Sequence, residues 1–595
     1  MAKDFEKSFI DVAPVEIRND VLRIEEATSF LLNYGTNKVI PDVVLRNEKT
    51  GSWIALLGTP LVNLTTEEEK RGFLNRFFGD PKSTLQDEIQ GCFALLSYNA
   101  AKDTFSVATD YNNTIPIYYA ITPNGVLISS HELQLARLLQ AEIDPLGFSM
   151  AIHLKVTWGS YTRFKNIYKL LPCQIIAFRD NSIIHSEHYW RPSTETQWPA
   201  NFDDVVEKWL TLLKESVQAY FACSKEKTVI CDFTAGEDAR LILSQCHALG
   251  IPFYAMVDGL DGDIDVRVAR EAAQRTGFNL VVRRRHLITE EQLIDNAIYV
   301  SLLNDGYQDY FQSCTDYATN LAHPAENYRY VKYCGAPGGE AFRGSYYLRG
   351  KALFPSRRDK LDYRFFTKMK WLLDFYPGLL CFSDEECRKT IFGLVEESLK
   401  DVDGFPVGIK IDHLLRLFQT CNGGLIYKNP RYLPFASNRM TRSVYSIPPR
   451  FKRGGRLTKA CTEILHPELA FVKTQKGVPT IRKTLPRTLL FMPEHVSVVR
   501  GIMSGTVSRL LKWTDSNKPS YRWSENAPAI KTLLTKSPYA NWFSSSRSMI
   551  TGSLYNNKVV DSLLADAKAG STRYVPILGR IINQELASRW VYRDR

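Results

Sequence analysis

An alternation of strand and helix patterns over residues 228–282 constrains the fold more than any other feature of the sequence. Three apolar runs are separated by two stretches in which apolar residues recur with helical spacing. The runs are 228–233, 253–257 and 280–282, and the helical stretches are 238–248 and 266–275. Apolar strands that alternate with helices are typical of a parallel sheet covered on both faces. The pattern therefore predicts a doubly wound α/β sheet with right-handed crossovers.

The first 190 residues follow a different rhythm. Short runs of β-branched and aromatic residues are separated by turn signals, which is typical of a layered antiparallel sheet. These runs are 53–57, 92–98, 105–109, 115–119 and 126–130, with one helical pattern at 133–139. A polar segment with two prolines, 190–199, has the composition of a linker. We therefore expect an antiparallel sandwich domain at 1–192 and a parallel-sheet domain at 200–595 that becomes mostly helical toward its end.

Composition excludes several classes of protein. With 595 residues, of which 44% are hydrophobic, the chain can bury large cores and is not a disordered protein. No apolar run reaches the roughly 18 residues of a membrane-spanning helix, and the charged start lacks the apolar stretch of a signal peptide. The eleven cysteines form no CxxC pair, which favours reduced thiols over a zinc site. A net charge of +11 is too weak to indicate nucleic-acid binding. We expect a cytoplasmic protein with no nucleic-acid partner and no membrane span.

The loop after the first parallel strand is the first candidate for chemistry. It consists of Thr234, Ala235, Gly236, Glu237, Asp238, Ala239 and Arg240. Small residues at the carboxyl end of a parallel strand let backbone N–H groups approach a polyphosphate, and the helix that follows adds a positive dipole. Asp238 is placed where its carboxylate could hold a magnesium ion on those phosphates. An ordinary strand-to-helix turn has the same composition, so this loop alone does not establish a nucleotide site.

The order of further segments makes the signal more specific. The loop, TAGEDA, resembles the SGGxDS pyrophosphate-binding loop of ATP pyrophosphatases, and residues 335–346, GAPGGEAFRGSY, resemble the GxGxDExFGGY segment of asparagine synthetases. Residues 433–438, LPFASN, and 473–479, KTQKGVP, resemble later blocks of the same family. In the front half, GCFAL at 91–95 and DYNNTIPIYY at 110–119 resemble class II glutamine amidotransferase domains. The chain thus resembles the asparagine synthetase family up to about residue 480. The resemblance implies an Ntn-type amidotransferase-like domain followed by an ATP-dependent ligase domain.

The resemblance also implies site residues and cofactors. ATP and Mg²⁺ would be the cofactors, with Asp238 and Glu340 as metal ligands. The loop residues 234–240, Gly338 and Arg343 would bind ATP and pyrophosphate. Glu340 and one lysine, Lys473 or Lys476, would be catalytic, and spacing does not choose between the two lysines.

Three departures from the family pattern bear on activity. Class II amidotransferases use an N-terminal cysteine, whereas removal of Met1 would expose Ala2, which cannot attack an amide. Gly339 stands where the family has a metal-binding aspartate, so either Glu340 takes over the metal or one ion is lost.

The third departure is a pair of arginines, Arg240 and Arg343, at positions where family members have small residues. As planar cations with several donors, they could bind phosphate in place of a missing ion. Alternatively, they pair with Glu237 and Glu340 and block the site.

The loss of the glutaminase nucleophile is shared with lasso-peptide cyclases and β-lactam synthetases, as the resemblance implies. We therefore expect AMP-forming amide-bond formation, in which a substrate carboxylate is adenylated and then attacked by an amine. Macrolactam cyclization of a ribosomal peptide is the leading reaction, on a peptide or a small amino-acid-like substrate. A leader-peptide-binding protein and a protease of the same pathway would be partners. The alternatives are ammonia-dependent amidation of a small acid and a non-catalytic homologue that binds nucleotide or substrate.

Overall fold

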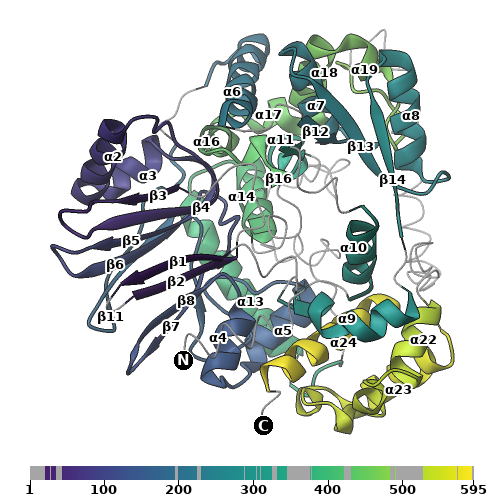
Figure 1. The fold of residues 1–595 in the computed structure, drawn as a ribbon. Helices are drawn as coiled ribbons and strands as arrows, with labels where there is room; N and C mark the ends of the chain where they lie inside the picture. The colour runs from purple at the N-terminus through teal and green to yellow at the C-terminus, as the bar shows by residue number, and fades with distance from the viewer. Residues whose placement is uncertain are drawn as a thin grey trace.

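Two kinds of sheet divide the molecule, as the sequence predicts (Figure 1). Antiparallel sheets occupy the first 190 residues, a parallel sheet follows, and the C-terminal part is largely helical, so the chain is of the mixed α/β class. The computed structural model describes residues 21–26, 29–34, 43–194, 198–223, 229–286, 289–302, 305–307, 310–323, 331–344, 376, 378–382, 384–420, 431–482, 490, 527–571 and 574–592.

The front part is built on a six-stranded antiparallel sheet with the order β11-β10-β6-β5-β4-β3. Its strands are β3 (Val43–Arg46), β4 (Trp53–Leu61), β5 (Gln90–Asn99), β6 (Thr104–Thr109), β10 (Gln174–Arg179) and β11 (Ser182–His188). Alternate side chains of β5 face opposite sides, as expected for a strand. Phe93 and Leu95 pack under helices α2 (Glu67–Gly79) and α3 (Pro81–Asp87), whereas Cys92 and Ala94 face the second sheet.

The second antiparallel sheet has the order β8-β7-β9. Its strands are β7 (Tyr118–Thr122), β8 (Gly125–Ser129) and β9 (Tyr168–Lys169), and a separate hairpin pairs β1 (Val21–Glu26) with β2 (Ser29–Tyr34). The strand expected at 115–119 begins only at Tyr118. The turn at 110–114 and Pro116, which has no N–H for a strand ladder, account for the later start.

The parallel sheet has the order β14-β13-β12-β15-β16, and all neighbouring strands run in the same direction. Its strands are β12 (Val229–Asp232), β13 (Phe253–Gly259), β14 (Leu280–Arg284), β15 (Val331–Tyr333) and β16 (Arg431–Tyr432). The first three strands and helices α7 (Asp238–Ala248) and α8 (Ile264–Thr276) confirm the predicted alternation. The last two strands were not predicted, because three and two residues are too few to form a recognisable pattern.

Helices account for most of the other regular structure in the described residues. They are α4 (Glu132–Leu139), α5 (Pro145–Leu154), α6 (Phe202–Cys223), α9 (Glu290–Leu302), α10 (Tyr310–Ala322), α11 (Gly338–Phe342), α13 (Asp384–Leu399), α14 (Val407–Thr420), α16 (Asn438–Ser446), α17 (Pro449–Lys452), α18 (Arg456–Leu465), α19 (Pro467–Phe471), α22 (Ala527–Thr535), α23 (Asn557–Lys568) and α24 (Val575–Val591). Short 3₁₀ turns lie at 400–402, 434–436, 453–455, 540–543, 546–548 and 552–554. Across the described ranges, no helix combines the length and the apolar character needed to cross a bilayer.

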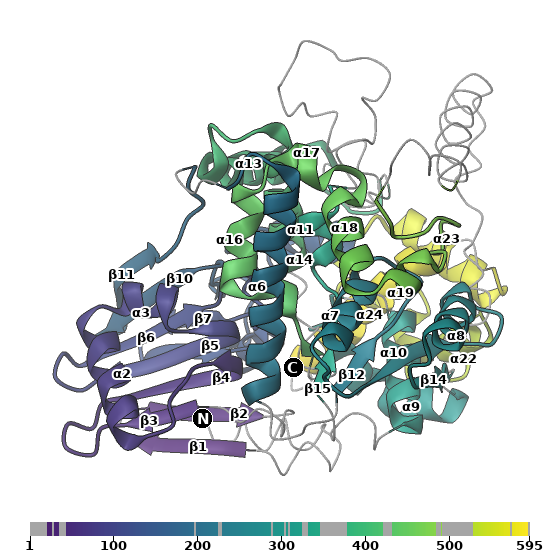
Figure 2. The same cartoon turned by 90° about the horizontal axis from the view of Figure 1, so that it is seen from above.

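The front part and the helical C-terminal part share hydrophobic cores. Helix α6 stands between the antiparallel sheets and the parallel sheet (Figure 2). Trp590 of α24 packs in one cluster with Tyr118 and Leu133 of the front part. Phe148 and Ile152 of α5 belong to a second cluster built mainly from α9, α10 and the last three helices. The final helix therefore stabilises the front part directly.

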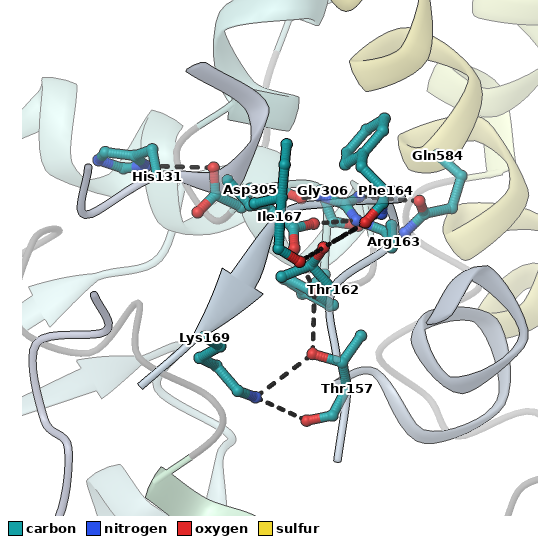
Figure 3. A network of polar contacts seen from close by, with 12 residues as sticks. His131, Thr157, Thr162, Arg163, Phe164, Ile167, Lys169, Asp305, Gly306 and Gln584 are labelled. Carbon is teal, nitrogen blue, oxygen red and sulfur yellow. Dashed lines mark hydrogen bonds and ion pairs between the residues drawn. The ribbon is translucent and has the colours of Figure 1, made fainter. Parts of the chain in front are cut away.

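A buried polar network reinforces this junction (Figure 3). Arg163 donates from Nε to the Glu132 carboxylate, from Nη1 to Gln584 Oε1 at 2.8 Å, and from Nη2 to the Asp305 carbonyl. The Tyr307 hydroxyl donates to the other Glu132 oxygen at 2.9 Å. Arg163 and Glu132 are almost completely buried, so each charge depends on the other for compensation. Through the Arg163 guanidinium, the network connects α4, the segment after α9 and the final helix.

We predict that Arg163→Met lowers the free energy of unfolding by about 3–5 kcal/mol, because the Glu132 carboxylate is left buried without its cation. Lys165→Met is the matched control, since it removes an exposed ion pair with Glu142 and should cause no measurable change. Urea unfolding followed by circular dichroism measures both variants. Equal losses from the two variants would show that the buried pair has no special role.

Candidate active site

The candidate site lies where the strand order reverses, between the carboxyl ends of β12 and β15 (Figure 2). Ligands of open α/β sheets bind in the crevice at such a point. Lys332 of β15 and Asp232 of β12 form an ion pair of 3.0 Å. The loop after β15 then touches the start of α7, where a Cβ on Gly335 would lie 2.6 Å from the Ala239 backbone nitrogen. Two segments about a hundred residues apart thus form one surface, and only glycine permits the contact.

Asp238 and Arg343 meet on this surface. Asp238 is the first residue of α7, and its Oδ2 lies 3.0 Å from Nη2 of Arg343. Both side chains are partly exposed. Gly339 makes room for them, because a Cβ there would fall well within contact distance of the Arg343 guanidinium and 2.8 Å from Asp238 Oδ2. The sequence predicts that Arg240 and Arg343 either bind phosphate or pair with Glu237 and Glu340; the carboxylate that pairs with Arg343 is Asp238 instead.

Glu237 has a different cation, which the sequence did not point to. Its Oε1 lies 3.8 Å from Nζ of Lys459 in α18, and both side chains are buried. The same ammonium donates to the Gly454 carbonyl at 3.1 Å. One feature could have identified Lys459: it is a lysine within the otherwise buried stretch 457–462 of an amphipathic helix. A lysine in such a place generally has a carboxylate or carbonyl partner.

Arg240 does not face the open side of the loop. Its side chain is fully buried, and Nη1 donates to the Leu469 carbonyl at 3.0 Å and to the Val472 carbonyl. Burial lowers the pKa of this guanidinium to about 10, against the raising effect of Glu237. The expected phosphate-binding position is therefore corrected: Arg240 anchors α19 beneath the loop. The third residue of α7 points into the protein body, where no ligand phosphate can reach it.

The segment with the two candidate lysines lies alongside the loop. The Gln475 N–H donates to the Ala235 carbonyl at 3.2 Å, and the turn is closed by Thr474, whose N–H donates to the Val478 carbonyl at 2.8 Å. Lys473 and Lys476 are both exposed. The structure brings this segment to the site without choosing between the lysines.

Two backbone N–H groups of the loop already donate to side chains of the protein. The Ala235 N–H donates to the Asp265 carboxylate of α8 at 2.8 Å, and the Gly236 N–H donates to Thr234 Oγ1 at 3.2 Å. These bonds hold the loop in shape but occupy the groups expected to meet a phosphate. An anion at this edge would therefore meet the N-terminal end of α7 and the Arg343 guanidinium.

The residues that the structure describes do not fit a magnesium site built by the protein. Within these ranges, no group of three or more His, Cys, Asp or Glu side chains is arranged to hold a metal. Asp238, the expected ligand, is paired with Arg343. Glu340 lies in α11, but its side chain is outside the described part, so its expected role stays a prediction.

The front part supports the site through the segment 433–438. The ring of Phe435 lies against Gly338, where a Cβ would be 2.7 Å from the ring. The neighbouring Ala436 carbonyl accepts a hydrogen bond of 2.8 Å from the Asn112 side chain. Asn112 in turn donates its N–H at 2.7 Å to Asp110, a fully buried carboxyl that also binds the Phe93 N–H at 2.9 Å. A chain of contacts therefore runs from the front sheet to the glycine-rich turn.

The described cysteines of the front part are unsuited to nucleophilic attack. Cys92 and Cys173 are both buried. Burial, together with the charge of Asp110, raises the pKa of the Cys92 thiol to about 12, and burial raises that of Cys173 to about 12 as well. Neither forms the thiolate that amide hydrolysis requires. Ala2, where the family pattern has its nucleophile, lies outside the described residues.

Comparison with known proteins assigns part of the chain. Residues 77–190 match the family model of a glutamine amidotransferase domain. This range runs from the end of α2 through β11 and includes both antiparallel sheets except β3 and β4. No curated protein matches the chain. Residues 77–190 of the front part are therefore of the amidotransferase type, which is compatible with an amide-forming enzyme.

We predict that Asp110 makes stability depend on pH. Burial raises the pKa of this carboxyl from its ordinary 3.8 to about 6, against the lowering effect of its hydrogen bonds. The folded protein therefore keeps the proton between about pH 4 and 6, where the unfolded chain has lost it. The stabilising contribution of the Asp110 proton is fully present below this window. It is lost as pH rises through the window, which lowers the free energy of unfolding by up to about 3 kcal/mol.

Asp110→Asn removes the titrating carboxyl. Between pH 4 and pH 7 the free energy of unfolding of the wild type should therefore fall relative to that of the variant. Urea unfolding at several pH values measures it, and the exposed Asp103→Asn variant controls for the loss of one negative charge. Parallel profiles for wild type and Asp110→Asn would contradict the assignment.

Proposed function

We propose that the sheet edge between β12 and β15 binds ATP and that the protein uses it to activate a substrate carboxylate for amide-bond formation. The observation that carries this proposal is the convergence of three segments, 234–240, 335–343 and 473–479, at one edge. These are the segments that resemble the ligase blocks of asparagine synthetases. Glycines and backbone groups make many of their contacts, and the paired side chains of Asp238 and Arg343 stay partly exposed at this edge.

The proposed chemistry has two steps. In the first, a carboxylate oxygen attacks the α-phosphorus of ATP, which enters as its magnesium complex, and the bond to pyrophosphate breaks. Negative charge grows on the departing pyrophosphate, and the N-terminal end of α7 together with Arg343 is placed to stabilise it. In the second step, an amine attacks the acyl carbon of the adenylate and AMP leaves with the bonding electrons. Lys473 or Lys476 would offset the charge that develops around the reacting group.

The source of the amine follows from the front part. It is an amidotransferase-type domain, yet its described cysteines are buried and their thiols stay protonated. Glutamine is therefore an unsuitable nitrogen donor, and we propose that the amine belongs to the substrate. Macrolactam cyclization of a ribosomal peptide meets this requirement, with a leader-peptide-binding protein and a protease as partners. The front domain then acts as a wall of the site, because it holds the segment 433–438 in place.

The proposal predicts that MgATP binding depends on the contact between the two loops. Gly335→Ala puts a Cβ against the backbone at Ala239 and should lower ATP affinity at least about tenfold by shifting the loops apart. Gly262→Ala is the matched control, because a Cβ there meets open space after β13 at the same sheet edge. Isothermal titration calorimetry measures the affinities, with circular dichroism to verify folding. Equal affinities in both variants, or no binding by wild type, would contradict the site.

Product mass distinguishes the possible reactions once a substrate turns over. Loss of one water within a single molecule, with release of AMP and pyrophosphate, supports cyclization. A product that forms only when ammonium is supplied, with a hydroxyl replaced by an amino group, means amidation of a small acid instead. ATP binding without AMP release for any carboxylate offered would favour a binding protein without catalytic activity.

A further inference from the structure

Arg343 and Gly339 form one structural unit. A side chain at position 339 would collide with the Arg343 guanidinium, so the arginine can lie where it does only because residue 339 is glycine. The resemblance to asparagine synthetases places an acidic residue at position 339 and a small residue at position 343. Here both positions differ, and the structure explains why they differ together: the cation fills the space that the missing side chain leaves.

Arg343 is held both at its backbone and at its side chain. The Arg343 carbonyl accepts a hydrogen bond of 2.7 Å from the Gly455 N–H, which fixes the backbone. Asp238 holds the other end at 3.0 Å, at the start of α7. The side chain keeps about a fifth of its surface exposed, so it is accessible from solvent. A guanidinium carries five N–H donors in a planar fork, and the geometry of this fork matches that of a phosphate group.

We propose that Arg343 is the phosphate-binding cation of this site and that Asp238 positions it. The inference rests on the proposed function, because it assigns the pyrophosphate end of the ATP site. As the bond between the α-phosphorus and pyrophosphate breaks, Arg343 donates N–H groups to the oxygens of the leaving group. A protein-bound cation supplies this charge without depending on a carboxylate cluster for a metal, which the described residues do not form.

The test measures binding of inorganic pyrophosphate to the full-length protein by isothermal titration calorimetry, once with Mg²⁺ and once with EDTA. Wild type should bind pyrophosphate in EDTA, and Arg343→Met should lose at least about tenfold in affinity there. Arg285→Met is the matched control, because Arg285 pairs with Asp263 at 3.5 Å at the same sheet edge and has similar exposure. It should bind like wild type. Arg343→Lys keeps the charge but not the planar fork, and should recover only part of the affinity.

A second variant tests the structural unit itself. Gly339→Asp combined with Arg343→Gly should bind pyrophosphate only when Mg²⁺ or Mn²⁺ is present, and Mn²⁺ binding is read directly by electron paramagnetic resonance.

Equal binding by wild type and Arg343→Met in EDTA would overturn the inference, as would wild-type binding that requires a metal. Failure of the inference can be distinguished from failure of the proposed function. If Arg343 governs pyrophosphate binding but no adenylate forms with any carboxylate, the inference stands and the function fails. If Arg343→Met forms adenylate at the wild-type rate, the function stands and the inference fails.

Discussion

The contact of the Gly335 backbone with the first turn of α7 is the constraint on which the candidate site depends. It is made without side chains, so the loop after β12 and the loop after β15 approach as closely as two backbones can. This closeness places Asp238 on one loop next to Arg343, which follows the other. Gly339 extends the same principle, because its missing side chain leaves the space for the guanidinium. The glycines of this segment thus determine where the charges of the site lie.

The front domain has a structural role at this edge. Its Asp110 turn presents Asn112 to the Ala436 carbonyl, and Phe435 then packs against Gly338. An amidotransferase-type domain with buried, protonated thiols can be retained for this reason, because the turn at 338 would lose its support without it. The shared cores with α24 point the same way, since removing the front part would expose apolar surface of the final helix.

Sequence patterns predicted the elements whose signals are local. Helix α7 begins and ends where its apolar spacing and Gly250 indicate, and the three long parallel strands follow from their apolar runs. The two short strands could not be found, because β15 and β16 are defined by pairing with distant neighbours rather than by their own composition. The candidate site, too, was predicted only where its signals are local. Motifs identified the loops, whereas the direction of Arg240 and the pairing of Glu237 with Lys459 depend on packing between segments more than 200 residues apart.

The central claim is that ATP binds at the carboxyl edge between β12 and β15. A crystal structure of the protein with a non-hydrolysable ATP analogue tests it most directly. We predict that the triphosphate lies at the N-terminal end of α7, with the guanidinium of Arg343 within hydrogen-bond distance of its β- or γ-phosphate oxygens and the segment 473–479 alongside. An analogue bound elsewhere on the molecule, with this edge unchanged, would contradict the account.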